Sequence, residues 1–193
     1  MGKLVVVENI SLDGVMQSPG RPDEDTRGGF DRGGWASALL AGDPQAAMAP
    51  MEDQGATAAM LFGRRTYLDL VGFWLSNPEP NPFTEILRNT PKYVVSSTLE
   101  EPLPHPSSTR ISLGDVAATK DAVAGDIVVL GSGELVRALA AAKLVDEYIL
   151  TILPVILGSG TRLFSETSAA TEVVKSFTSP TGIVVATYRV LPD

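Results

Sequence analysis

Two short apolar segments of this chain end in glycine and pass directly into segments with the composition of helices. The run 58–62 is followed by GRRT at 63–66, and the run 127–130 is followed by GSGE at 131–134. A strand that turns tightly into a helix is the repeating unit of α/β folds, so these junctions favour that class. A helix N-terminus also presents unpaired N–H groups and a positive dipole end, which attract phosphate.

The first junction carries additional donors for an anion. Arg64 and Arg65 supply forked, charge-assisted donors, and Thr66 adds a hydroxyl. The whole chain has a net charge of −8, so this cationic turn is a local exception that indicates a phosphorylated ligand. The alternative interpretation of this segment is a helix start with two solvated arginines that bind no ligand.

The second junction differs from the dinucleotide-binding fingerprint of doubly wound folds. That fingerprint requires a third glycine where Val136 stands, and an acidic residue about 20 positions further on, where Thr151 and its neighbours are uncharged. Gly131 and Gly133 still permit positive φ angles and a close approach of a ligand to the backbone. The alternative is a turn in which glycine serves only tight packing.

Strands and helices alternate along most of the chain, and a pair of strands follows them. Apolar and β-branched segments predict strands at 4–10, 58–62, 92–96, 109–112, 127–130, 146–153, 171–177 and 183–191. Helical spacing predicts helices at 35–40, 45–54, 65–73, 85–89, 116–124 and 134–144. We therefore expect one α/β domain over residues 1–193, with a mostly parallel sheet, helices on both faces and an antiparallel C-terminal edge.

The composition argues against several function classes. An acidic chain is a poor match for nucleic acid or for an anionic membrane surface, and no apolar run is long enough to span a membrane. Cysteine is absent, which fits a cytoplasmic protein and removes thiolate chemistry. The single histidine, His105, lies in a proline-rich loop, so we expect neither a metal site nor a Ser-His-Asp triad.

Residues 11–34 form a long polar segment rich in glycine. A stretch of this length without regular structure inside a compact domain is typical of a functional loop. Asp13 precedes Gly14, which is consistent either with a simple turn or with a site residue. Asp31 lies in the same segment, which we expect to cover the site, so its carboxylate is our candidate for the proton donor.

Four stretches together resemble one known group of proteins: ISLDGV at 10–15, LFGRRTY at 61–67, VVLGSGEL at 128–135 and LPVILGSG at 153–160. The order and spacing of the four stretches resemble those found in the dihydrofolate reductase-like superfamily. The resemblance is closest to the C-terminal reductase domain of the bacterial riboflavin-biosynthesis deaminase–reductase. It implies a three-layer sandwich, NADPH as the cofactor and a homodimer.

The resemblance also implies which residues contact NADPH. Phosphate would be bound by Gly63, Arg64, Arg65 and Thr66, and the adenosine ribose with its 2′-phosphate by Ser96 and Ser97. The pyrophosphate and the nicotinamide side would lie against Leu130, Gly131, Ser132, Gly133, Glu134 and Leu135. The segment from Asp13 to Val15 would lie beside the nicotinamide, which adds Asp13 to Asp31 as a catalytic candidate.

The resulting hypothesis is an NADPH-dependent oxidoreductase that resembles 5-amino-6-(5-phosphoribosylamino)uracil reductase. It would transfer hydride to a C=N or C=O group of a small heterocyclic or sugar-linked substrate. Dihydrofolate reduction is the alternative within enzymes; it would need a buried carboxylate on the helix after the first loop, near Asp31 or Asp43. A protein that binds NADPH without turnover is the alternative of another class.

Overall fold

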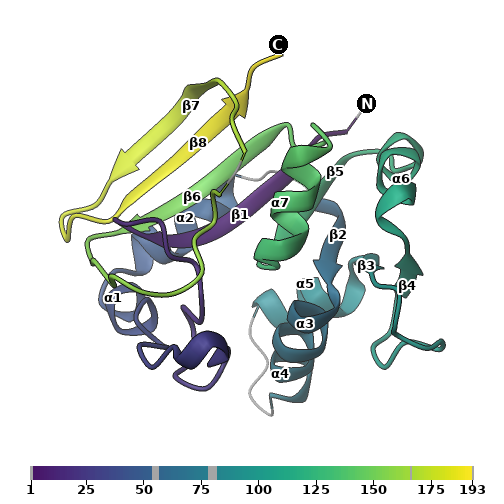
Figure 1. The fold of residues 1–193 in the computed structure, drawn as a ribbon, viewed down its shortest axis with the longest axis horizontal. Helices are drawn as coiled ribbons and strands as arrows, with labels where there is room; N and C mark the ends of the chain where they lie inside the picture. The colour runs from purple at the N-terminus through teal and green to yellow at the C-terminus, as the bar shows by residue number, and fades with distance from the viewer. Residues whose placement is uncertain (1, 54–56, 78–81, 166, 193) are drawn as a thin grey trace.

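The computed structural model describes residues 2–53, 57–77, 82–165 and 167–192. Within these, eight strands form one sheet in the order β4-β3-β2-β5-β1-β6-β8-β7 (Figure 1). The strands are β1 (Leu4–Ser11), β2 (Thr57–Gly63), β3 (Lys92–Val95), β4 (Ser108–Ile111), β5 (Asp126–Leu130), β6 (Glu147–Leu153), β7 (Thr171–Thr178) and β8 (Val184–Val190). Every strand predicted from the sequence is present, with each boundary within one residue.

The sheet is parallel from β4 to β6, and β8 and β7 are antiparallel to their neighbours. The apolar start of β1, LVVV, suits this centre because a strand covered on both faces buries every side chain. The predicted mostly parallel sheet with an antiparallel C-terminal edge is therefore confirmed.

Helices cover both faces of this sheet (Figure 1). They are η1 (Arg27–Gly29), α1 (Ser37–Ala41), α2 (Pro44–Asp53), α3 (Arg64–Thr66), η2 (Tyr67–Val71), α4 (Gly72–Ser76), α5 (Pro82–Asn89), η3 (Leu113–Asp115), α6 (Val116–Ala122) and α7 (Gly133–Ala141). On one face α6 and α7 pack in a cluster with alternate residues of β1, β2 and β5. On the other face α2 packs on β1, β6 and β8, while η2 and α5 pack on β2 and β3. The predicted sheet with helices on both faces, a three-layer sandwich, is therefore confirmed.

Every predicted helix is present, and its bounds differ from the prediction by up to three residues. The helix expected at 65–73 is longer, because α3, η2 and α4 follow one another from residue 64 to 76 with a π-helical turn in the middle. The helix expected at 45–54 is α2, and residue 54 lies outside the described residues. In the described part of the chain, every helix is too short or too polar to cross a membrane.

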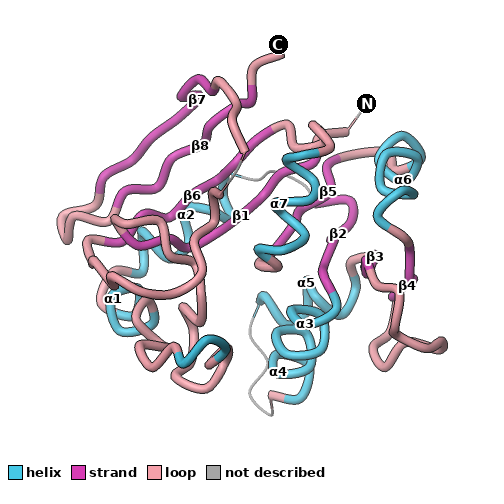
Figure 2. The backbone as a smooth tube through the Cα atoms, in the orientation of Figure 1, coloured by secondary structure: helices cyan, strands magenta, loops and turns pink. Residues whose placement is uncertain are grey.

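The segment between β1 and α1 is the longest loop near the carboxyl ends of the central strands (Figure 2). Its only regular turn is η1. Buried residues anchor it: Val15, Phe30 and Leu157 form a small apolar cluster, against which Trp35 packs. The loop is thus an ordered part of the fold, although little of it is helix or strand.

Candidate functional site

A cleft of about 1300 Å³ opens at the carboxyl ends of β5 and β1. Leu130, the last residue of β5, pairs with Val7, so β1 continues from Glu8 to Ser11 beside β6 alone. The chain also leaves these two strands in opposite directions, because β1 leads toward β2 and β5 leads toward β6. Ligands of open α/β sheets bind at such a switch point, outside the carboxyl ends of the strands.

The two glycine junctions meet at this cleft, since β2 and β5 are parallel neighbours. The N–H of Gly63 donates to Ser132 Oγ over 2.8 Å, and a Cβ on Gly63 would lie 3.2 Å from that oxygen. A Cβ on Gly131 would lie 2.9 Å from Thr66 Cγ2. The two turns therefore form one surface. They can touch because neither Gly63 nor Gly131 has a side chain that would separate them.

The second turn presents backbone to the cleft. Gly131 and Ser132 have φ angles of 60° and 68°, in the left-handed region that favours glycine. Helix α7 begins directly afterwards, and its first backbone hydrogen bond runs from Val136 N–H to the Ser132 carbonyl. The N–H groups of residues 133–135 precede that bond, so they are the ones that a helix start offers to an anion.

The structure brings together most of the residues expected to bind a cofactor. The cleft is lined by Arg64, Arg65, Thr66, Ser96, Ser97, Leu130, Gly131, Ser132, Gly133, Glu134 and Leu135. Two expected residues are not among the described lining residues. Gly63 lies behind the surface, where it holds Ser132, and Val15 is fully buried in the cluster with Phe30.

Asp13 has a structural role at the base of the first loop. Its Oδ1 accepts hydrogen bonds from Ser11 Oγ over 2.7 Å and from the N–H of Leu157 over 3.0 Å, and its Oδ2 accepts one from the N–H of Gly158 over 2.9 Å. These donors, led by Leu157, lower the pKa of Asp13 to about 2. The ionised Asp13 carboxylate joins the first loop to the segment at Leu157 and Gly158. It has no proton to donate at neutral pH. It is also not among the described residues that line the cleft.

Asp31 and Asp43 also lie apart from the described lining of the cleft. Asp31 is exposed on the first loop. Asp43 is buried, and its Oδ1 accepts a hydrogen bond from the N–H of Ala46 in the first turn of α2, while its Oδ2 accepts one from Thr181. The role of proton donor that we expected for Asp31 has no geometric support in this arrangement.

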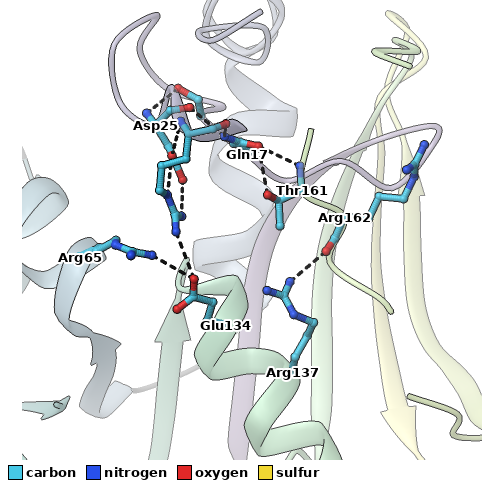
Figure 3. Close-up of polar contacts among 9 residues, drawn as sticks. Gln17, Asp25, Arg65, Glu134, Arg137, Thr161 and Arg162 are labelled. Carbon is cyan, nitrogen blue, oxygen red and sulfur yellow. Dashed lines mark hydrogen bonds and ion pairs between the residues drawn. The ribbon is translucent and has the colours of Figure 1, made fainter. Parts of the chain in front are cut away.

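The two arginines of the first junction differ in their surroundings. Arg65 Nη1 lies 3.0 Å from Glu134 Oε1, and Arg27 Nη1 lies 3.1 Å from the same oxygen (Figure 3). Hydrogen bonds from Arg27 and then Arg65 lower the pKa of Glu134. Arg64 is exposed, lines the cleft and forms no ion pair with any described residue. Arg64 can therefore bind a phosphate without first breaking an ion pair, whereas Arg65 would have to give up its contact with Glu134.

Ion pairs hold the first loop to both sides of the cleft. Arg27 reaches Glu134 at the start of α7, and Arg21 Nη2 lies 2.5 Å from Asp69 Oδ1 in η2. The Arg21 guanidinium also lies 4.5 Å from the ring centre of Phe73, a cation–π contact. These contacts tie the loop, whose residues 23–27 line the cleft, to η2 on one side and to α7 on the other.

Gln17 organises the inner side of that loop. Its Nε2 donates to the carbonyls of Asp25 and Arg27, both over 3.0 Å, and its Oε1 accepts from the N–H of Thr161 over 2.9 Å (Figure 3). Its own carbonyl accepts from Trp35 Nε1 over 2.8 Å. Both polar atoms of the Gln17 amide are therefore hydrogen-bonded, and the side chain holds residues 25–27 of the loop next to Thr161.

Comparison with known families adds to this geometry. The model of the RibD C-terminal domain family matches residues 3–185. The chain belongs to this family. The resemblance inferred from the four sequence stretches is therefore confirmed, while no curated protein sequence matches the chain significantly.

Solved structures similar to this member of the RibD C-terminal domain family share its fold. A protein of Shewanella sp. PV-4 assigned to riboflavin biosynthesis is 22% identical, with a TM-score of 0.66 and full coverage of both chains. A pyrimidine reductase-like protein of Corynebacterium diphtheriae is 13% identical, with a TM-score of 0.62, covering 100% of this chain and 93% of that one. Dihydrofolate reductase of Enterococcus faecalis, complexed with NADP(H), is 17% identical, with a TM-score of 0.62, covering 99% and 98%.

One acidic residue of this RibD C-terminal domain was missed by the sequence analysis. Glu8 lies in β1 and lines the cleft, yet only 6% of its surface is exposed, and its Oε1 has no hydrogen-bond partner among the described residues. Burial first, and then the charge of Glu24, raise the pKa of Glu8 to about 8. The available signal was a carboxylate directly after the apolar run 4–7 of a strand predicted to be buried, since a buried carboxylate is rarely without a role.

Proposed function

We propose that this chain is an NADPH-dependent reductase, folded as one domain and acting in the cytoplasm. It transfers hydride to a C=N or C=O group of a small heterocyclic or sugar-linked substrate. The observation that carries the proposal is the single surface formed by the two glycine turns at the switch point between β1 and β5. Membership of a family named after a riboflavin-biosynthesis protein supports it, as does the likeness in fold to a reductase complexed with NADP(H).

The residues present fit a dinucleotide phosphate. A free guanidinium at Arg64 and hydroxyls at Ser96 and Ser97 line one part of the cleft, and we assign them to the 2′-phosphate and its ribose. The first N–H groups of α7 and the bare backbone at Gly131 suit a pyrophosphate. A volume of about 1300 Å³ leaves space for a second small molecule beside the cofactor.

The protein's contribution is to bind, orient and exclude water. When bound, NADPH supplies the hydride. The glycine turns fix the position of its phosphates, and the loop held by Arg21 and Arg27 covers the site, which keeps water away from the reacting atoms. These roles require no metal, and in the described part of the chain no group of three or more metal-ligating side chains could hold one.

Turnover with a panel of candidate substrates tests this function. The panel includes dihydrofolate and the uracil intermediate of riboflavin synthesis, and loss of the absorbance of reduced nicotinamide is followed. We expect oxidation of NADPH with a pyrimidine or related heterocycle. A rise in melting temperature with NADPH, with no turnover on any member of the panel, would favour a binding protein instead.

Arg64→Ala is expected to weaken NADPH binding by roughly 10- to 100-fold and to leave NADH binding almost unchanged, because only NADPH carries a 2′-phosphate. Arg65→Ala is the matched comparison, since Arg65 is already paired with Glu134. We expect it to have the smaller effect. Calorimetric titration of both variants with both cofactors measures this, and equal losses for NADPH and NADH in Arg64→Ala would reject the assignment.

We also propose a homodimer. Strand β7 ends the sheet, its residues 171–176 are all exposed, and Val173 and Val174 retain 59% and 47% exposure. Apolar side chains on an uncovered edge strand favour association. Light scattering should give twice the chain mass of 20.4 kDa, and Val174→Lys should give the single mass. A wild-type mass of 20.4 kDa at every concentration would contradict the dimer.

A further inference from the structure

Glu8 occupies a distinctive place in the cleft. It follows Val7, whose partner Leu130 is the last residue of β5, so the sheet is open on that side of Glu8. Alternation along β1 puts its side chain on the same face as Val6 and Ile10, which pack in a cluster with Met16 and Leu135 of the cleft wall. The Glu8 carboxyl is therefore buried against apolar side chains at the inner end of the cleft.

Every other carboxylate that lines the cleft in the described part of the chain already has a polar partner. Asp25 pairs with Arg27, Asp69 with Arg21, and Glu134 with both Arg27 and Arg65. Glu24 Oε2 accepts hydrogen bonds from two backbone N–H groups of the loop, and Asp23 lies 3.8 Å from Arg21. Those side chains are used to hold the loop, whereas Glu8 has no such task.

No cation within the described residues forms an ion pair with Glu8. The arginines of the cleft are Arg27, Arg64, Arg65 and Arg137. Two of them are held by Glu134, and Arg137 donates to the carbonyl of Arg162 over 3.1 Å. Arg64 forms no ion pair with Glu8 or with any other described residue. The remaining charged groups of the lining are Asp23, Glu24, Asp25, Asp69 and Glu134, all acidic. A carboxyl facing these surroundings keeps its proton, because ionisation would leave a buried charge without compensation.

We propose that Glu8 is the proton donor of the reductase reaction. This inference rests on the proposed function. The substrate carbon of the C=N or C=O group gains a C–H bond with the hydride from reduced nicotinamide. The electron pair of the π bond moves to the nitrogen or oxygen, which takes the proton from the Glu8 carboxyl. Glu8 is left as a carboxylate and regains a proton from water that enters between turnovers.

Glu8→Gln tests the proposal, because it keeps the size and hydrogen-bonding capacity of the side chain and removes the transferable proton. We expect kcat to fall by about 100- to 10,000-fold while NADPH affinity is unchanged. In the wild-type protein kcat should fall as pH rises and Glu8 ionises, and Glu8→Gln should lack that decline. Asp121→Asn, which alters an exposed carboxylate of α6, is the matched control and should behave as wild type.

A second readout is independent of turnover. In carbon-13-labelled protein without cofactor, the carboxyl signal that disappears in Glu8→Gln should titrate close to pH 8, well above the ordinary value of 4.5 for a glutamate. Glu24→Gln should move that titration to lower pH, because the charge of Glu24 opposes ionisation of Glu8.

The outcomes separate this inference from the proposed function. If the wild-type protein neither binds nor oxidises NADPH, the proposed function fails and this inference fails with it. If the wild-type protein oxidises NADPH but Glu8→Gln retains its kcat, or Asp31→Asn loses it instead, only the role of Glu8 is overturned. A Glu8 signal that titrates near the ordinary glutamate value of 4.5 overturns it as well.

Discussion

Glu8→Gln is expected to make the protein more stable than wild type by about 3 kcal/mol at pH 7 and about 4 kcal/mol at pH 8. The cause is that the pKa of Glu8 is raised from its ordinary 4.5 to about 8 in the folded protein. Between these values the unfolded chain has lost the proton and the folded chain has kept it. Folding must then take up a proton, so the wild-type protein loses stability as pH rises.

Chemical denaturation of both proteins at several pH values measures this difference. The two free energies of unfolding should agree near pH 4.5 and diverge steadily up to about pH 8. Asp121→Asn should follow the wild-type curve, because its carboxylate is exposed on α6. Parallel curves for Glu8→Gln and wild type would mean that Glu8 ionises normally in the folded protein.

Gly133→Val is expected to lower NADPH affinity by about 100-fold or more, equivalent to ~3 kcal/mol, while the protein stays folded. Gly133 is the first residue of α7, and its backbone lines the cleft. An added Cβ would meet Met16 Sδ at 2.5 Å, but that sulfur lies near the end of a flexible side chain and can move. The new side chain would then occupy the space where we expect the pyrophosphate.

Gly131→Val should combine the same loss of binding with a loss of stability. The residue has a φ of 60°, which costs a branched residue about 1–2 kcal/mol, and a Cβ would also press on Thr66. Gly182→Val is the matched control: Gly182 has a φ of 84° with no atom near its added Cβ, and it lies outside the described cleft lining.

Circular dichroism and cofactor titration of the three glycine variants distinguish the explanations. We expect Gly182→Val to lose stability but keep NADPH binding. If Gly133→Val unfolds the protein, the glycine serves helix–strand packing. If Gly133→Val binds NADPH as tightly as wild type, the turn does not contact the cofactor.

The sequence was sufficient to predict the sheet and the two glycine turns. Strand β5 and the turn after it are local features: a β-branched run, two glycines and a helix start identify them without knowledge of the rest of the chain. The pairing of β2 with β5, which brings Gly63 to Ser132, was not predicted; the resemblance to a known family implied only that both glycine turns contact one cofactor.

The roles of the acidic residues could not be predicted in the same way, because long-range contacts decide them. Asp13 accepts hydrogen bonds from residues 144 and 145 positions away, which no local pattern indicates. Glu134 is paired with Arg27, 107 positions away. The sequence shows Glu8 as a carboxylate within a strand, but its role depends on its burial and on the lack of a hydrogen-bond partner for its Oε1 among the described residues. We had therefore expected Asp31 to be the donor.

Calorimetric titration of the wild-type protein with NADPH and with NADH tests most directly whether the cleft between β1 and β5 is a cofactor site. We predict one NADPH bound per chain, with an affinity roughly 10- to 100-fold higher than that for NADH, as expected for charge-assisted bonds to the 2′-phosphate. No detectable binding of NADPH, or equal affinities for the two cofactors, would contradict the assignment.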